Sequence, residues 1–288
     1  MKKSYRITIY VLLAFWAGYE VHKNKVFPIG RFIERNFFEK EVVAKLQKKE
    51  RALALLDHVY VDISKKSEVS CPAEKDAYVI VGIGQSNSAN SAEHRFETNK
   101  DIVNFYNGKC YVANDPMLGA TGRKGSLWIP LSEQLKIKYK TIVLSTFGVG
   151  ATKVSDWLND DHLMPFYKEN NDSLTKVYNK PNAVVWIQGE SDVSTPHKVY
   201  SEQLQDWFEI LRTDFSDSNI YVTGTSYCGN RSNESVLFAQ RKQAENIGAI
   251  YVGSTDKLVQ QSYRYDDCHF SEMGTKALAS LIAESWIK

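Results

Sequence analysis

A serine and a histidine that lie far apart in the chain have the side chains needed for nucleophilic catalysis. Ser86 follows an apolar run at residues 77–83, and Asp266 precedes His269 by three residues near the C-terminus. A serine hydroxyl is a weak nucleophile at neutral pH, so a base must accept its proton during attack. Histidine titrates in the required range, and a carboxylate can fix the tautomer of its ring. These residue types are those of a serine hydrolase.

Neither residue is diagnostic alone, because such a serine can be a turn or helix N-cap and such a histidine can be structural. Two further apolar runs strengthen the interpretation. Residues 141–147 lead into a glycine loop that contains Gly150, and residues 182–187 lead directly into Gln188. Ligands of open parallel sheets bind beyond the carboxyl ends of the strands. The pattern therefore predicts that Ser86, Gly150 and Gln188 lie at one edge of one sheet.

Five motifs follow one another along the chain. They are Gly84-Gln85-Ser86-Asn87, Asp115-Pro116, Gly148 to Gly150 with Trp157 after it, Trp186-Ile187-Gln188-Gly189-Glu190-Ser191-Asp192, and Asp266-x-x-His269. Taken in this order, they resemble the motifs of the SGNH-type hydrolases, and within that group they are most similar to the sialate O-acetylesterase and acetylxylan-esterase branch, which is like carbohydrate esterase family 6. The resemblance covers residues 76–288. The chain departs from the family pattern at Ile187, where histidine is usual, and at Ser88, where methionine is usual.

The resemblance implies a role for each motif residue. Ser86 is the expected nucleophile and His269 the expected general base. Asp266 is expected to orient the imidazole, and Asp267 is the alternative carboxylate. The expected oxyanion hole combines the backbone N–H groups of Ser86 and Gly150 with the side-chain amide of Gln188.

The remaining motif residues are expected to support this site. The resemblance implies supporting roles for Gln85, Asn87 and Glu190, with contact to the sugar as the alternative for Glu190. Asp192 is expected to cap the segment that follows it. Preorganised donors of an oxyanion hole each contribute about 10²- to 10³-fold to turnover, so small displacements by such neighbours matter.

Apolar runs that alternate with helix-like stretches predict an α/β fold with a parallel sheet and helices on both faces. The resemblance narrows this to a three-layer α/β/α sandwich around a mostly parallel, flavodoxin-like sheet of five strands, the SGNH hydrolase fold. Asn107-Gly108 predicts a hairpin within residues 103–113. A hydrophobic N-terminal helix is expected to precede this domain.

Charge and residue spacing argue against a nucleic-acid-binding protein and against a metal- or cofactor-dependent enzyme. The chain has 36 Lys and Arg against 34 Asp and Glu, a net charge of +2, and no basic stripe. Nucleic acid is therefore not an expected partner. The six histidines show no metal-ligand spacing and no Cys-x-x-Cys pair occurs, so neither a metal nor another cofactor is expected.

The N-terminal region differs from the rest of the chain. Residues 1–25 have a basic start and an apolar run without a cleavage site, which predicts a signal-anchor or transmembrane segment. The alternatives are a cleaved signal or a helix packed on the domain. Residues 26–74 are expected to form an amphipathic helical stalk and linker, and residues 75–288 the esterase domain. This organisation predicts a single-pass membrane anchor with an extracytoplasmic domain on the periplasmic or cell-surface side.

Four cysteines form an even set, for which three pairings are possible. We hypothesise a disulfide between Cys228, just beyond the end of a strand, and Cys268, next to the candidate base. The alternative is four buried thiols, which a cytosolic location would favour.

The expected function is removal of O-acetyl groups from a glycan or polysaccharide through an acyl-serine intermediate, with an acetylated carbohydrate as the partner. One alternative is a polysaccharide O-acetyltransferase that uses the same acyl-serine, and another is a glycan-binding module without catalysis. Trp128, Trp157 and Tyr227 are either part of a sugar-stacking surface or part of the core.

Overall fold

The computed structural model describes residues 50, 53–98, 101–159 and 162–287. The chain divides into two compact units, Met1–Arg51 and Ala52–Lys288. The predicted anchor at residues 1–25 and the predicted stalk up to residue 49 lie outside the described residues. Among the helices that are described, none combines the length and the apolar character required to cross a membrane.

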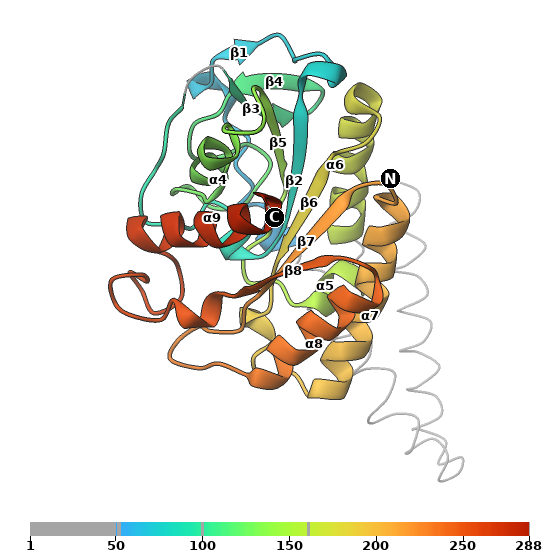
Figure 1. The fold of residues 1–288 in the computed structure, drawn as a ribbon, viewed down its shortest axis with the longest axis vertical. Coiled ribbons are helices and arrows are strands. Elements are labelled where there is room, and N and C mark those ends of the chain that lie inside the picture. The colour runs from blue at the N-terminus through green and yellow to red at the C-terminus, as the bar shows by residue number, and fades with distance from the viewer. Residues whose placement is uncertain (1–49, 51–52, 99–100, 160–161, 288) are drawn as a thin grey trace, which may run out of the picture. The chain divides into compact units, whose positions relative to one another are not determined.

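An eight-stranded sheet forms the centre of the second unit (Figure 1). Its order is β1-β4-β3-β5-β2-β6-β7-β8. The strands from β3 to β8 in this order pair in parallel, and β4 and β1 add antiparallel pairings at one edge. The bounds are β1 Glu68–Val69, β2 Tyr78–Gly84, β3 Ile102–Tyr106, β4 Lys109–Val112, β5 Ile142–Thr146, β6 Ala183–Ile187, β7 Asn219–Gly224 and β8 Ile250–Ser254.

The expected α/β fold with a mostly parallel sheet is confirmed, but the expected number of five strands is wrong, because the sheet has eight. The predicted hairpin is not separate from the parallel strands. Its first strand, β3, pairs in parallel with β5, and its second strand, β4, pairs with the two-residue β1. The Asn107-Gly108 turn predicts how β3 and β4 pair with each other, but it carries no information about their outer neighbours.

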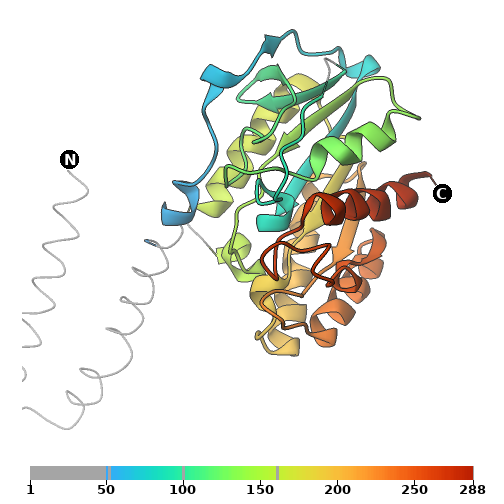
Figure 2. The same cartoon turned by 90° about the vertical axis from the view of Figure 1, so that its left-hand side faces the viewer.

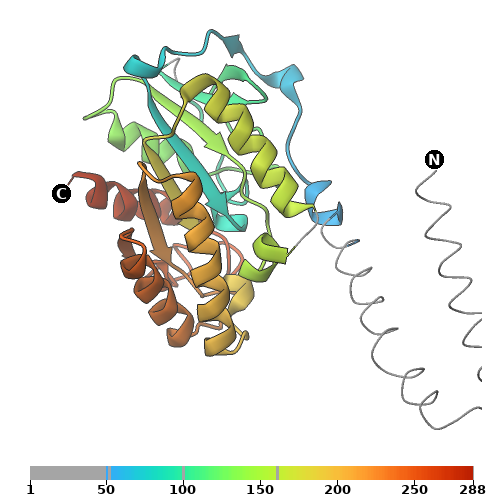
Figure 3. The same ribbon diagram turned by 90° about the vertical axis from the view of Figure 1, so that its right-hand side faces the viewer.

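Helices cover both faces of the sheet (Figures 2 and 3). Their bounds are α4 Trp128–Leu135, α5 Val154–Asn159, α6 Leu163–Tyr178, α7 His197–Asp214, α8 Glu234–Asn246 and α9 Glu272–Ile287. Residues of α4 and α9 share one hydrophobic core with Ile80, whereas residues of α5 to α8 share the other with Val79, Val81 and Ile83. The two-residue period of β2 therefore divides its side chains between two buried layers.

The order in which strands are added to the sheet reverses at β2. The strands β3 and β5 lie to one side of β2, and the later strands β6, β7 and β8 lie to the other. Ligands of such sheets bind beyond the carboxyl end of the strand at this switch point. Gly84 ends β2 with φ +137°, and a Cβ there would lie 2.0 Å from the Ile187 carbonyl oxygen. Glycine thus lets β2 stay close to β6 just before Ser86.

The segment predicted as a linker is fixed to the domain in its described part. The two residues of β1 pair with β4, and a disulfide joins Cys71 to Cys110 of β4. The Lys66 ammonium donates hydrogen bonds of 2.6 Å to the carbonyl oxygens of Asn114 and Pro116. Burial lowers the pKa of Lys66 to about 8.

Candidate active site

Ser86 opens a short 3-10 turn, Ser86–Ser88, directly after β2. The turn is closed by the Ser88 N–H, which donates to the Gln85 carbonyl oxygen at 2.9 Å, and the Trp128 indole donates to the Ser88 carbonyl oxygen at 2.8 Å. Ser86 is 7% exposed and lines a pocket of about 630 Å³. The turn therefore holds a serine at the switch point of the sheet, beside a cavity that can admit a ligand.

Asp266 and His269 form a hydrogen-bonded pair. Asp266 Oδ2 lies 2.8 Å from His269 Nδ1, and Asp266 Oδ1 accepts the His269 backbone N–H at 2.7 Å. Partial burial raises the pKa of Asp266, but these hydrogen bonds outweigh burial and hold that pKa below its usual value. Asp267, the alternative carboxylate, has φ +59° and its backbone carbonyl accepts the Gly229 N–H. Asp266 is thus the carboxylate that contacts the ring.

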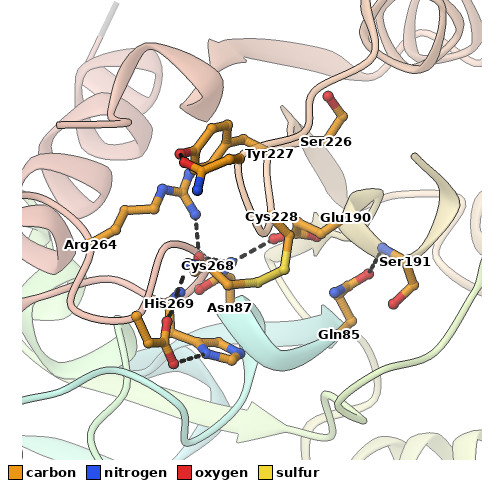
Figure 4. Close-up of a disulfide and its surroundings, with 12 residues drawn as sticks. Gln85, Asn87, Glu190, Ser191, Ser226, Tyr227, Cys228, Arg264, Cys268 and His269 are labelled. Carbon is orange, nitrogen blue, oxygen red and sulfur yellow. Dashed lines mark hydrogen bonds and ion pairs between the residues drawn. A yellow bond between two sulfur atoms is a disulfide. The ribbon is translucent and has the colours of Figure 1, made fainter. Parts of the chain in front are cut away.

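The serine and histidine loops are joined through Asn87. Its side-chain amide donates to Glu190 Oε1 at 2.5 Å and lies 3.4 Å from the Cys268 carbonyl oxygen (Figure 4). Ser86 and His269, the neighbours of these two residues along the chain, line the same pocket. In the described part of the chain, no hydrogen bond joins the Ser86 hydroxyl to the His269 ring. Such bonds are often long in ligand-free enzymes and tighten when substrate binds.

Gly150 lies beside Ser86. A Cβ at Gly150 would be 3.7 Å from the Ser86 Cβ, and both residues line the pocket. The Gly150 N–H donates to Thr121 Oγ1 at 2.7 Å. Thr121 was not singled out in the sequence, since a lone threonine in a loop carries no signal. The structure therefore brings Ser86, Gly150 and His269 to one pocket.

Gln188 is the third donor expected in the oxyanion hole. It is fully buried and is not among the residues that line the pocket. Its amide donates to Asp192 Oδ2 at 2.7 Å and to the Thr152 carbonyl oxygen at 3.1 Å. Asp192 also accepts the Val154 N–H at 2.9 Å, so this carboxylate caps the start of α5. The Gln188 amide is thus engaged by Asp192 and by the Thr152 carbonyl oxygen.

Two of the expected supporting residues hold the loop that follows β6. Gln85 Oε1 accepts the Ser191 N–H at 3.1 Å and thereby ties this loop to the end of β2. Glu190 lines the pocket and is buried, with Oε1 accepting from Asn87. Glu190 Oε2 has no hydrogen-bond partner among the described residues. Gln85, Asn87 and Glu190 thus connect the loops after β2 and β6 with the histidine loop.

Arg264 braces the histidine loop through hydrogen bonds to three carbonyl oxygens. No pattern in the sequence points to this role. It is 1% exposed, and its Nε and Nη2 donate to the Leu258 and Thr255 carbonyl oxygens at 2.8 and 3.2 Å. Its Nη1 donates to the Cys268 carbonyl oxygen. Burial lowers the pKa of Arg264. A single arginine in a polar segment is usually a solvated surface residue, so the sequence gives no reason to select this one.

A disulfide lies directly beside the candidate base. Cys228, in the loop after β7, is bonded to Cys268, with a Cα–Cα distance of 4.2 Å (Figure 4). This is the pairing hypothesised from the sequence, and the second disulfide joins Cys71 to Cys110. Two disulfides are typical of proteins that fold outside the cytoplasm.

The core contains both residues that depart from the family pattern. It also contains two of the three aromatic residues considered for a sugar-stacking surface. Ile187 and Ser88 are fully buried and do not line the pocket. Trp128 and Trp157 are also fully buried, so they do not form a sugar-stacking surface. Tyr227 is half-buried, with the Arg264 guanidinium 5.2 Å from its ring centroid.

The fold has counterparts among solved structures. A protein from Arabidopsis thaliana is 17% identical, with a TM-score of 0.58, and the match covers 75% of this chain and 98% of that one. NanS is 13% identical, with a TM-score of 0.50, over 75% of this chain and 98% of its own. At these identities the likeness concerns the fold alone. No curated protein matches the sequence at a significant level.

A family model agrees with the motifs. The model described as "Carbohydrate esterase, sialic acid-specific acetylesterase" matches residues 75–288. The resemblance drawn from the motifs is thereby confirmed, over nearly the same residues. Because the match covers most of the chain, this protein belongs to the sialic acid-specific acetylesterase family of carbohydrate esterases.

Proposed function

We propose that this protein is a serine esterase that removes O-acetyl groups from a glycan through an acetyl-serine intermediate. The observation that carries the proposal is that Ser86 and the Asp266–His269 pair border one pocket at the switch point of the sheet. Family membership supports an acetylated carbohydrate as the substrate.

The proposed acylation step uses Ser86 as nucleophile and His269 as base. Because Asp266 accepts a hydrogen bond from Nδ1, the neutral ring has a lone pair on Nε2. Ser86 Oγ attacks the acetyl carbonyl carbon while Nε2 takes the hydroxyl proton. The bond from the carbonyl carbon to the sugar oxygen then breaks, and Nε2 returns the proton to that oxygen. The products are a free sugar hydroxyl and acetyl-Ser86.

Deacylation repeats the same chemistry with water. Water attacks the acetyl carbonyl carbon while His269 Nε2 takes one of its protons. The bond to Ser86 Oγ breaks, the proton passes to Oγ, and acetate leaves. An O-acetyltransferase would replace this water by a sugar hydroxyl, so acetate released per ester consumed separates the two reactions.

The backbone N–H groups of Ser86 and Gly150 are the proposed donors to the oxyanion. Ser86 and Gly150 lie side by side in the pocket lining, and no described residue accepts the Ser86 N–H. The Gly150 N–H would exchange Thr121 Oγ1 for the oxyanion. Gln188, the third donor implied by the family resemblance, would have to release Asp192 to take part.

We further propose that the catalytic domain works outside the cytoplasm and that residues 1–25 anchor it to a membrane. The two disulfides support the first statement, since thiols stay reduced in the cytosol. The basic start and apolar run of residues 1–25 support the second.

The test is hydrolysis of p-nitrophenyl acetate and of O-acetylated sialic acids and acetylated xylan fragments by wild type and Ser86→Ala. Ser191→Ala is the matched control, because Ser191 lines the same pocket and offers the same hydroxyl. We expect Ser86→Ala to lose at least about 10³-fold in kcat and the control to remain within a few-fold of wild type. Equal activity of wild type and Ser86→Ala would refute the proposal.

A further inference from the structure

The pocket extends to a segment that precedes the family-matched region. Leu55 and His58 line the same pocket as Ser86 and His269. Both lie upstream of residue 75, where the match to the family model begins. Leu55 is half-buried against the core and His58 is exposed.

Backbone pairing fixes this segment, which Figure 2 shows in blue along one side of the domain. Residues 58–60 lie against the loop at residues 119–122. Hydrogen bonds of 2.9 to 3.1 Å join Tyr60 to Gly119 and Ala120 and His58 to Gly122, and Val59 forms an antiparallel bridge with Thr121. A paired backbone therefore sets the position of His58, and Leu55 is one helical turn before it.

The same loop reaches the proposed reaction centre. Thr121, which pairs with Val59, accepts the Gly150 N–H through its hydroxyl at 2.7 Å. Gly150 in turn lies beside Ser86. The upstream segment is thus connected to the nucleophile through the contacts of Thr121 and Gly150, and these residues line the same pocket.

We propose that Leu55 and His58 form a subsite that binds the sugar portion of the substrate, an inference that rests on the proposed esterase function. The ester must lie at Ser86 and His269, and an acetyl group is small. The sugar then occupies the rest of the pocket, which Leu55 and His58 also line. A sugar ring presents both C–H faces and hydroxyl groups. The aliphatic side chain of Leu55 can pack on the C–H face, and the imidazole of His58 can donate a hydrogen bond to a hydroxyl group or accept one from it.

Leu55→Ala and His58→Ala test the subsite in the full chain. Leu53→Ala and Asp57→Ala are the matched controls, because these neighbours lie in the same segment but do not line the pocket. Each variant is assayed with p-nitrophenyl acetate, which lacks a sugar, and with the acetylated glycan that wild type deacetylates fastest. The labelling rate of Ser86 by a small and by a bulky fluorophosphonate is measured in parallel.

We expect Leu55→Ala and His58→Ala to raise KM for the glycan by about fivefold or more, the effect of losing one contact. Turnover of p-nitrophenyl acetate should stay within about twofold of wild type, which also shows that each variant folds. The ratio of bulky to small labelling rates should change in these variants and not in the controls. An unchanged glycan KM with wild-type ester turnover overturns the subsite alone. A wild type that neither hydrolyses esters nor reacts at Ser86 overturns the proposed function, and the subsite with it.

Discussion

Asp266 holds His269 by two contacts at once. One carboxylate oxygen accepts from the ring Nδ1 and the other from the backbone N–H of the same residue. The first contact selects the tautomer of the ring and stabilises its protonated form, and the second fixes the residue that carries the ring. Asp267, next in the chain, accepts the Gly229 N–H through its backbone carbonyl oxygen.

Replacing Asp266 should therefore affect catalysis far more than replacing its neighbour. We expect Asp266→Asn to lower kcat by about 10³- to 10⁴-fold, because an amide at this position favours the wrong tautomer of His269. Asp267→Asn should retain activity within a few-fold of wild type. Steady-state kinetics with p-nitrophenyl acetate decides, and the reverse ranking of the two variants would assign the orienting role to Asp267.

The two disulfides allow the effect of a cross-link on stability to be separated from its effect on the proposed site. Cys228–Cys268 joins the loop after β7 to the histidine loop, and Cys71–Cys110 joins the segment after β1 to β4. Their sequence separations, 40 and 39, are nearly equal. In the chain-entropy account each contributes about 4 kcal/mol to the free energy of unfolding. Their effects on stability should be alike, whereas only the first touches the proposed site.

Removing each disulfide by paired Cys→Ala substitutions separates stability from activity. Both double variants should lose similar free energy of unfolding in urea, on the order of 2 to 4 kcal/mol. Only the variant without Cys228–Cys268 should lose kcat, because the loop that carries His269 is then free to move. Equal kcat/KM in the two variants at a temperature where both are folded would show that the disulfide does not position His269.

The buried carboxyl group of Asp115 should make the free energy of unfolding depend on pH. Burial raises the pKa of Asp115 to about 6, although hydrogen bonds from the Phe96 and Ser126 N–H groups oppose this. Between about pH 4 and pH 6 the native state therefore binds more protons than the unfolded state at this carboxyl group. The contribution of Asp115 to the unfolding free energy must fall as the pH rises through this range.

An uncharged amide at this position should remove that dependence. The stability of Asp115→Asn relative to wild type should improve by on the order of 2 to 3 kcal/mol between about pH 4 and pH 7. Urea unfolding of both proteins across this range measures the difference at each pH. A difference that stays constant would contradict a raised pKa at Asp115.

At the scale of the whole molecule, the proposal places a catalytic domain outside the cytoplasm behind an N-terminal anchor. If residues 1–25 provide the anchor, the full chain should sediment with membranes, and deletion of these residues should release an active enzyme. Fractionation followed by p-nitrophenyl acetate hydrolysis measures both properties. Recovery of the full chain in the soluble fraction would contradict the anchor and leave the catalytic proposal intact.

Local patterns in the sequence predict the parallel strands and the residues that follow them. Ser86 and Gly150 each follow an apolar run, so the sheet topology brings them together without further information. Contacts that depend on tertiary packing could not be predicted in this way. In the sequence, Arg264 resembles an ordinary surface cation, although its side chain is hydrogen-bonded within the structure. The two residues of β1 are too few to show a periodic pattern. The hydrogen bond from Gln188 to Asp192 depends on side-chain geometry that the sequence does not reveal.

The residue to which the acetyl group becomes attached identifies the nucleophile directly. The protein is mixed with p-nitrophenyl acetate, quenched in acid within the first turnovers, and digested for peptide mass spectrometry. The account predicts an acetyl group on Ser86 in wild type, and none there in His269→Ala on the same timescale. Ester hydrolysis with the acetyl group on another residue, or with Ser86 acetylated equally fast without His269, would contradict it.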